Sequence, residues 1–253
     1  MEDLQNQASS SDHSSSLEGE TKNRSAQIRD MAMRTLNWFK ETTFIVIMAL
    51  TLSILLRTFV FQAFFVPSSS MVETLQIDDR IIASKLSLHF GDIQRGDIVV
   101  FQDPGGWLPF SMEQEGWRGT LTKALTFIGV LPANSGEDLV KRVIGVGGDS
   151  IKCCSKNGNL IINGVEVDES AYAQPGTDLL KFNIVVPEGR LFVMGDNRGA
   201  SSDSRSHMDV QNGTIPVENV VGQVVARIWP LSRFTTMDPS AALQAVPDPD
   251  SKK

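Results

Sequence analysis

Near the N-terminus, the longest apolar run of the chain predicts a membrane-spanning helix. The run covers residues 42–66 and carries one charge, at Arg57. Roughly 24 apolar residues suffice to cross a bilayer as a helix, and an arginine near one end can snorkel to the headgroups. A cleaved signal peptide would have an apolar core of only about 7–15 residues, followed by a small-x-small cleavage site. We therefore expect a retained transmembrane anchor at residues 42–66.

The segment before this run is polar, and we expect residues 1–41 to be a largely disordered cytoplasmic tail. Residues 1–25 are rich in Ser, Glu, Asn and Gln and cannot bury enough apolar surface to offset the entropy of ordering. Residues 22–40 are basic and loosely helical in spacing, which fits a helix on a membrane surface or in solvent. Because positive charge clusters before the run, the chain beyond Pro67 should lie on the outer (periplasmic or lumenal) side.

Beyond Leu75 the apolar pattern becomes that of short β-strands. Apolar or alternating runs are separated by Gly, Asn, Asp and Pro, and Asn157-Gly158 and Asn163-Gly164 are typical of hairpin turns. The predicted fold class is mostly β: a single N-terminal transmembrane helix followed by an antiparallel β domain over residues 67–235. The expected strands are residues 80–84, 98–101, 139–146, 150–153, 160–162, 165–167, 182–186, 190–194 and 220–229.

Two stretches depart from the β pattern. Within residues 107–135, Leu121, Ala124, Leu125 and Ile128 fall at helical spacing, which predicts one amphipathic helix inserted into the domain. Residues 236–253 are rich in Pro, Asp, Ser and Lys. We expect them to form a disordered C-terminal tail.

Composition and charge exclude several classes of protein. The 253 residues allow one medium-sized domain with appendages, and the net charge of -7 disfavours a nucleic-acid-binding protein. The three histidines and two cysteines form no cluster with metal-ligand spacing, so a zinc or di-metal enzyme is disfavoured. Cys153 and Cys154 are neighbours, with Cα atoms expected about 3.8 Å apart, below the usual disulfide minimum of about 4.4 Å. We favour unpaired thiols on a polar turn over a vicinal disulfide.

Serine chemistry is the main catalytic possibility. Ser68, Ser69 and Ser70 directly follow the apolar run. They could form only a polar hinge, or they could contain a nucleophile, which needs a base. Histidine is the common base, but neither His89 nor His207 is accompanied by a Gly-x-Ser-x-Gly elbow. A Ser-His-Asp triad therefore rests on no local signature.

Lysine is the other possible base. A lysine accepts a proton near neutral pH only if desolvation or a nearby cation lowers its pKa. Lys141 lies in the strand predicted at residues 139–146, where alternate residues share a face, so its neighbours on that face are Leu139 and Val143. Periodicity alone nevertheless favours an ordinary lysine on an edge strand.

A third polar stretch follows the strand predicted at residues 190–194. Residues 194–205 are dense in hydrogen-bonding groups. Asp203 and Arg205 could pair and rigidify a turn, and a serine here could hold the lysine amine in position. Most stretches of this kind are only polar surface loops.

Taken together, these stretches resemble the bacterial type I signal peptidases, also called leader peptidases. The resemblance covers the apolar run and nearly all of the β domain but neither tail, and its specificity lies in four motifs that occur in the family's order. The motifs are Pro67-Ser68-Ser69-Ser70-Met71 with Thr74-Leu75; Gly91-Asp92-Ile93 with Arg95-Gly96-Asp97-Ile98-Val99-Val100-Phe101; Lys141-Arg142-Val143-Ile144-Gly145 with Gly148-Asp149; and Gly195-Asp196-Asn197-Arg198 with Ser201, Asp203, Ser204 and Arg205.

The resemblance implies a membrane-bound serine endopeptidase of the cell membrane. Its partners would be the lipid bilayer and secretory preproteins, cleaved after small residues at Ala-x-Ala-type sites without a metal or cofactor. Ser70 matches the nucleophile and Lys141 the general base of a Ser/Lys dyad. The other matches are to supporting groups: Ser68 (side-chain oxyanion donor), Ser201 (orientation of the lysine amine), and Asp203 with Arg205 (a structural pair).

The chain departs from the family pattern at a few positions. Family members usually have Gly where Ser69 stands and Pro where Glu73 stands, and often Pro where Gly147 stands. The Glu73 carboxylate could favour the charged lysine and slow catalysis, or it could point to solvent without effect. It leaves open an alternative, a catalytically weak, membrane-anchored β module that binds exported chains. A relative of the self-cleaving SOS repressors is disfavoured by the apolar run and by the lack of a DNA-binding segment.

Overall fold

The structure, a computed structural model, divides the chain into two compact units, residues 1–53 and 54–253. Each unit is described by itself. The predicted helix around residues 121–128 and the predicted tail at residues 1–30 lie outside the described residues. The described residues are 31, 33–35, 37–56, 59–86, 93–108, 138–174 and 180–249.

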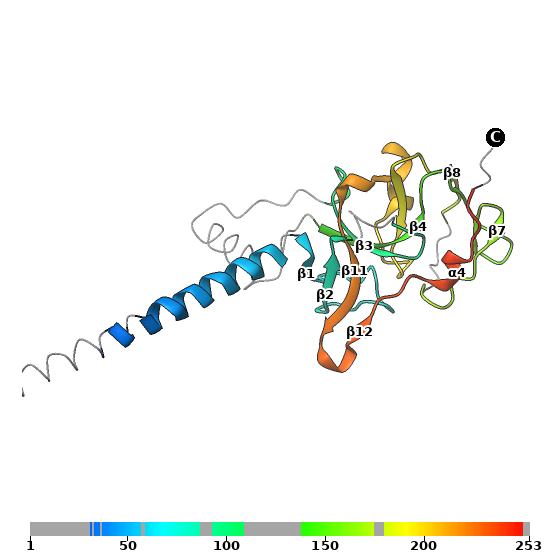
Figure 1. Ribbon diagram of the computed structural model, residues 1–253. Helices are drawn as coiled ribbons and strands as arrows, with labels where there is room; N and C mark the ends of the chain where they lie inside the picture. The colour runs from blue at the N-terminus through cyan, green and yellow to red at the C-terminus, as the bar shows by residue number, and fades with distance from the viewer. Residues whose placement is uncertain are drawn as a thin grey trace, which may run out of the picture. The chain divides into compact units, whose positions relative to one another are not determined.

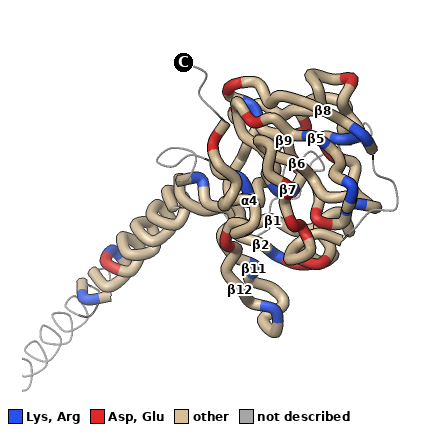
Figure 2. Tube along the Cα trace, turned by 90° about the vertical axis from the view of Figure 1, so that its right-hand side faces the viewer, with Lys and Arg blue, Asp and Glu red and all other residues tan. Residues whose placement is uncertain are grey.

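A helix, Met33–Leu56, contains the first part of the apolar run, residues 42–56. Its 24 residues give a length of about 36 Å at 1.5 Å per residue, so by length and composition it could cross a bilayer. Charged residues Arg34, Lys40 and Glu41 lie in its first part, and residues 42–56 carry none (Figure 2). The helix begins before residue 42, where the anchor was predicted to start, so the last part of the predicted disordered tail at residues 1–41 is helical from Met33 on.

The predicted end of the anchor at residue 66 is wrong. Residues 61–65 form strand β1 (Phe61–Phe65), which pairs antiparallel with β2 (Arg80–Ser84) and buries Phe64. An apolar run cannot by itself distinguish a helix from a buried strand, and here pairing with β2 decides the conformation. As a consequence, Ser70 follows a strand of the β domain.

Eight strands form the larger sheet, in the order β1-β2-β11-β3-β4-β9-β10, with β12 paired to β11 (Figure 1). Every pair in it is antiparallel. The prediction of a mostly antiparallel β fold is confirmed, although β1, β10 and β12 were not among the expected strands. The remaining strands are β3 (Ile98–Gln102), β4 (Asp138–Gly145), β9 (Arg190–Met194), β10 (Ile215–Pro216), β11 (Val220–Trp229) and β12 (Thr235–Thr236).

Four strands form the smaller sheet, in the order β7-β6-β5-β8. Asn163 and Gly164 join β6 to β7 with φ values of 51° and 82°, the left-handed conformations that a type I′ hairpin requires. The sequence pattern had predicted this turn. The strands are β5 (Ser150–Cys153), β6 (Leu160–Ile162), β7 (Val165–Glu166) and β8 (Phe182–Val185), and the short helices are η1 (Ser204–His207), η2 (Gln211–Gly213), η3 (Val217–Asn219), η4 (Leu231–Arg233) and α4 (Ala241–Gln244).

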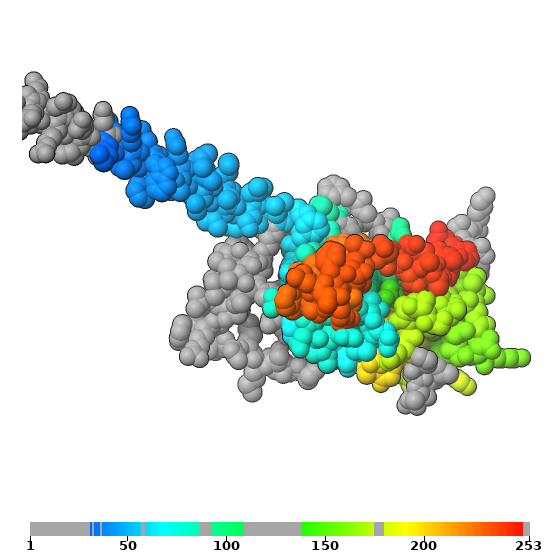
Figure 3. Space-filling model, turned by 90° about the horizontal axis from the view of Figure 1, so that it is seen from below, coloured from blue at the N-terminus to red at the C-terminus, as the bar shows by residue number. Residues whose placement is uncertain are grey.

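Residues 236–249 of the C-terminal segment are ordered, contrary to the predicted disordered tail at residues 236–253, of which residues 250–253 lie outside the described residues. Leu243 of α4 and Val246 join the core cluster that also contains side chains of the smaller sheet and β9. Arg95 Nη1 donates to the Val246 carbonyl at 3.0 Å, and Figure 3 shows the segment lying on the β domain. Only two buried apolar side chains hold this polar segment in place, too few for its composition to predict that it is ordered.

Cys153 and Cys154 are bonded to each other through their sulfur atoms, whereas the sequence favoured unpaired thiols. The peptide bond between them is cis, and their Cα atoms lie 3.0 Å apart. The spacing of a trans peptide, on which the prediction was based, therefore does not apply here.

Candidate active site

Ser70 lies in the turn that follows β1. The turn is anchored from within, because Met71 and Leu75 pack in the core cluster that contains side chains of β1, β2 and β3. The Leu75 N–H donates to the Met71 carbonyl at 2.7 Å. With these two side chains held inward, the turn presents the Ser70 hydroxyl to β4.

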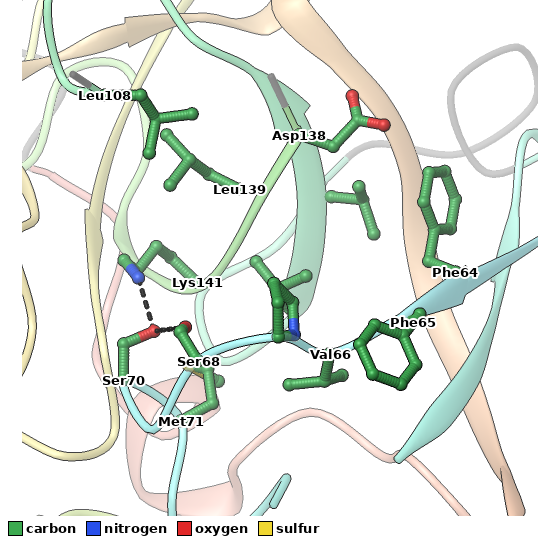
Figure 4. Close-up of a pocket in the computed structure, with 13 residues that line it drawn as sticks. Phe64, Phe65, Val66, Ser68, Ser70, Met71, Leu108, Asp138, Leu139 and Lys141 are labelled. Atoms are coloured by element: carbon green, nitrogen blue, oxygen red, sulfur yellow. Dashed lines mark hydrogen bonds between the residues drawn. The ribbon is translucent and has the colours of Figure 1, made fainter. Parts of the chain in front are cut away.

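The Ser70 hydroxyl meets the Lys141 amine, as Figure 4 shows. The distance between Lys141 Nζ and Ser70 Oγ is 2.6 Å, and the two residues are 3% and 7% exposed. β4 lies between β3 and β9, so Lys141 is not the edge-strand lysine that periodicity favoured. A hydroxyl in hydrogen-bond contact with a buried amine is the geometry of an activated nucleophile and its base.

Burial sets the proton affinity of Lys141. Desolvation lowers the pKa of its amine from 10.5 to about 8, and the positive charge of Arg205 acts in the same direction. The negative charges of Asp203 and Asp196 oppose this shift. Because desolvation prevails, a substantial fraction of the amine is neutral near physiological pH and can accept a proton.

A cavity of about 320 Å³ opens beside the dyad. Its walls are largely apolar and include Phe64, Val66, Leu108 and Val140. Ser68 also lines it, and the Ser68 and Ser70 Oγ atoms lie 3.2 Å apart (Figure 4). A small apolar side chain of a bound peptide would fit here, with a hydroxyl close to the nucleophile.

The loop after β9 packs directly against the nucleophile's turn. The Asn197 N–H donates to the Ser70 carbonyl at 3.0 Å, and Asn197 Nδ2 donates to the Ser69 carbonyl at 3.1 Å. A Cβ on Gly195 would collide with the Ser70 carbonyl and with Ser201 Oγ. Glycine at this position therefore permits the close approach of the two segments.

Asp203 and Arg205 form an ion pair behind this loop, at 2.8 Å between Oδ2 and Nη2. Burial alone would raise the pKa of the Asp203 carboxyl, but the hydrogen bond and charge of Arg205 outweigh burial, and the pKa lies below its usual value. Ser201 Oγ is buried and helps to lower the pKa of the Asp203 carboxyl, but it makes no hydrogen bond to Lys141. The structure thus brings Ser201 close to the site without joining it to the amine.

A buried polar cluster of Arg142, Asp196 and Thr74 was not recognised as functional from the sequence. The Arg142 guanidinium donates to both carboxylate oxygens of Asp196 at 2.8 and 2.7 Å, and Thr74 Oγ1 donates to the same carboxylate at 2.5 Å. The cluster ties β4, the loop after β9 and the Ser70 turn together. A charged residue inside an apolar strand was the signal for it, although its partner could not be deduced.

Metal ligation finds no support in the part of the chain that the structure describes. No group of three or more His, Cys, Asp or Glu side chains there is arranged to hold an ion. The polar side chains that line the cavity are the Ser68 and Ser70 hydroxyls, the Lys141 amine and the Asp138 carboxylate.

Comparison with known proteins identifies the family to which this chain belongs. A model described as signal peptidase, peptidase S26, matches residues 36–229. This chain belongs to the signal peptidase family. The matched range contains every candidate site residue, and it disfavours the relation to the self-cleaving repressors.

Curated relatives agree with the family match. Signal peptidase I of Mycobacterium tuberculosis (strain ATCC 25618 / H37Rv) is 36% identical over 226 residues, which covers 77% of this chain and 74% of that protein. Signal peptidase I of Leptolyngbya laminosa is 32% identical and covers 76% and 80%. The probable thylakoidal processing peptidase 2 of Arabidopsis thaliana is 32% identical and covers 74% of this chain and 43% of that protein.

Glu73 is one of the two residues of the nucleophile's turn, with Ser69, at which the sequence was expected to depart from the family pattern. Its side chain is exposed, its Oε1 accepts from Gln174 Nε2 at 2.5 Å, and it is not among the charges that shift the pKa of Lys141. Its φ of 92° is closed to proline, whose φ is fixed near -65°. This backbone could not take the proline usual at the position, and the carboxylate interacts with Gln174.

Proposed function

We propose that this chain is a membrane-anchored serine endopeptidase that removes signal peptides from exported preproteins with a Ser70/Lys141 dyad. The observation that carries the proposal is the buried contact of 2.6 Å between the hydroxyl and an amine whose pKa burial lowers to about 8. Membership of the signal peptidase family supports the substrate class. The alternative of a weakly catalytic binding module rested on Glu73 acting on the lysine. It is disfavoured, because the Glu73 carboxylate contacts Gln174 instead.

In the proposed reaction, Ser70 Oγ attacks the carbonyl carbon of the scissile bond while the neutral Lys141 amine takes its proton. The ammonium so formed returns the proton to the leaving amine, and the C–N bond breaks to leave an ester between Ser70 and the signal peptide. Water then attacks the ester carbonyl carbon as Lys141 again accepts a proton. The ammonium returns this proton to Ser70 Oγ as the ester C–O bond breaks, which releases the signal peptide as a carboxylic acid and restores the dyad. At pH 7 a base with a pKa of about 8 is neutral in roughly one molecule in ten.

Two serines are proposed to assist the dyad. Ser68 Oγ and the Ser70 backbone N–H would donate to the oxyanion of the tetrahedral intermediate, and loss of one such donor typically costs on the order of 10²–10³ in rate. Ser201, whose Oγ is buried, would orient the Lys141 amine. The apolar cavity would accept the small residues before the cleaved bond.

The helix Met33–Leu56 is proposed to anchor the enzyme, with the N-terminus cytoplasmic and the β domain outside. Basic residues before the apolar run support this orientation. Protease added outside sealed cells should digest the chain beyond Pro67. Complete protection of that region would contradict the proposed orientation and place the β domain on the cytoplasmic side.

Cleavage of a preprotein by the full-length protein in lipid nanodiscs tests the catalytic proposal. We expect cleavage at an Ala-x-Ala site, and we expect Ser70→Ala and Lys141→Ala each to abolish it while the fold persists. Matched controls are Ser69→Ala, next to the nucleophile, and Lys152→Ala, an exposed lysine on β5; both should retain activity. Cleavage by either dyad variant would contradict the proposal, and a folded but inactive wild type would favour the binding module.

A further inference from the structure

Trp107 and His207 form an aromatic stack apart from the dyad. Their ring centroids lie 4.5 Å apart and their planes differ by 6°. Trp107 is buried and also meets Phe101 edge-on at 5.8 Å, whereas His207 is half-buried. The stack joins the loop after β3 to η1, two segments far apart in the sequence.

On one side, the stack supports a wall of the cavity beside Ser70. The Asp103 carboxylate accepts the backbone N–H groups of Trp107 and Leu108, both at 3.1 Å. Leu108 lines the cavity (Figure 4). Because Leu108 follows Trp107 in the same hydrogen-bonded loop, a displaced Trp107 ring would displace that wall.

On the other side, the histidine supports the groups that act on the base. His207 Nδ1 lies 2.9 Å from the Asp203 carbonyl oxygen, and since a carbonyl only accepts, Nδ1 carries the proton. The Asp203 carboxylate pairs with Arg205 at 2.8 Å and accepts the Gly195 N–H at 2.9 Å. Of the charged groups that influence Lys141, Asp203 acts most strongly.

We infer that His207 is a positioning residue that couples the substrate cavity to the base: its ring holds Trp107 and thereby Leu108, and its Nδ1–H holds Asp203. The inference rests on the proposed peptidase function. It assigns His207 two separable contacts, one for substrate fit and one for the proton affinity of Lys141. His207 contacts neither substrate nor the reacting atoms and takes no part in proton transfer.

Three substitutions separate the two contacts. His207→Phe keeps a flat ring on Trp107 but removes the donor to Asp203. His207→Asn keeps a donor near the position of Nδ1 but removes the ring, and His207→Ala removes both. Val210→Ala, on an exposed residue three positions further along, is the control. Each variant is assayed as full-length protein in nanodiscs, with kcat and KM measured across pH.

We expect a different signature from each variant. His207→Asn should raise KM roughly two- to tenfold, the loss typical of one aromatic pair, and leave the pH midpoint of kcat unchanged. His207→Phe should keep KM and move that midpoint to lower pH, because Asp203 raises the pKa of Lys141 more than its partner Arg205 lowers it. His207→Ala should show both changes, and Val210→Ala neither.

Two results would overturn the inference. One is wild-type behaviour of both His207→Phe and His207→Asn; the other is an equal fall of kcat in all three variants with KM and the pH midpoint unmoved, as for a merely structural residue. The stack has its own readout, an upfield ring-current shift of the His207 C–H NMR signals that Trp107→Leu should abolish. Absence of that shift refutes the stack even if cleavage is normal, whereas failure of the wild type to cleave refutes the proposed function.

Discussion

The proposed role of Lys141 as a base depends on its surroundings, which disfavour a positive charge. The amine is buried on a central strand, and desolvation acts on it more strongly than the two carboxylates that oppose it. Ser70, by contrast, contributes ordinary chemistry at a well-fixed place. The protonation state of Lys141 should therefore control both cleavage and stability.

The pH dependence of cleavage should follow the titration of Lys141. Only the neutral amine accepts the Ser70 proton, so kcat/KM should rise with pH around a midpoint near 8 and level off above it. The measurement is a pH profile of preprotein cleavage by the wild type. A flat profile between pH 7 and 9 would argue against Lys141 as the base.

The same pKa predicts that the base destabilises the fold. Since the pKa is about 8 folded and 10.5 in the reference state, the unfolded chain binds more protons between these values, and stability rises with pH there. Below pH 8 the cost is constant, about 3 kcal/mol at 1.36 kcal/mol per pKa unit. Lys141→Met should therefore unfold at higher denaturant concentration than wild type at pH 7, and the advantage should vanish near pH 10.5.

An exposed lysine provides the comparison for this stability effect. Lys152→Met, on β5, removes a solvated amine and should leave the unfolding midpoint almost unchanged at both pH values. A Lys141→Met protein that is less stable than wild type at pH 7 would show that the Ser70 contact outweighs the desolvation cost.

Among the elements, the active site depends on how closely the loop after β9 approaches the turn after β1. One backbone hydrogen bond from Asn197 to Ser70 and one from the Asn197 side chain to the Ser69 carbonyl hold them together, and the Arg142–Asp196 pair braces both from β4. The contact is between main chains, so it tolerates little added volume.

Gly195→Ala should damage the site at this contact. The added methyl meets the Ser70 carbonyl and the Ser201 side chain, and overpacking of this kind typically costs about 1–3 kcal/mol. We expect cleavage to fall on the order of a hundredfold, the usual result of a displacement of about 1 Å, while a folded domain persists by circular dichroism. Ala200→Ser, on the exposed part of the same loop, should cleave normally; full activity of Gly195→Ala would contradict the packing argument.

For the molecule as a whole, the C-terminal segment completes the core. Leu243 is fully buried in the cluster that contains side chains of the smaller sheet, and the buried Arg95 binds Asp149 at 2.7 Å as well as the Val246 carbonyl. The segment thus contributes both apolar burial and a partner for a buried cation.

Leu243→Ala should lower the stability of the whole β domain. Truncation of a buried leucine typically costs about 2–5 kcal/mol, and the loss should appear as a lower unfolding midpoint. Leu231→Ala is the matched control, because Leu231 is 72% exposed. Equal stability of the two variants would mean that the C-terminal segment is not part of the cooperative unit.

Local sequence features predicted much of this protein. The apolar run, the short alternating strands and the Asn-Gly turns depend on neighbouring residues, so the helix and most of the sheet could be placed. The motifs around Ser70, Lys141 and Asp203 named the site residues through a family resemblance. Periodicity alone could not identify Lys141 as a candidate base, since it favoured an ordinary lysine on an edge strand.

What remained was decided by contacts between distant segments. The apolar residues of β1 form a strand only because β2 is available to pair with them, and α4 is ordered only because the core accepts Leu243. The proton affinity of Lys141 depends on desolvation by residues scattered along the chain. Sequence alone determined which groups and local conformations exist; tertiary structure decided which are buried together, because pairing and desolvation are properties of the assembled fold.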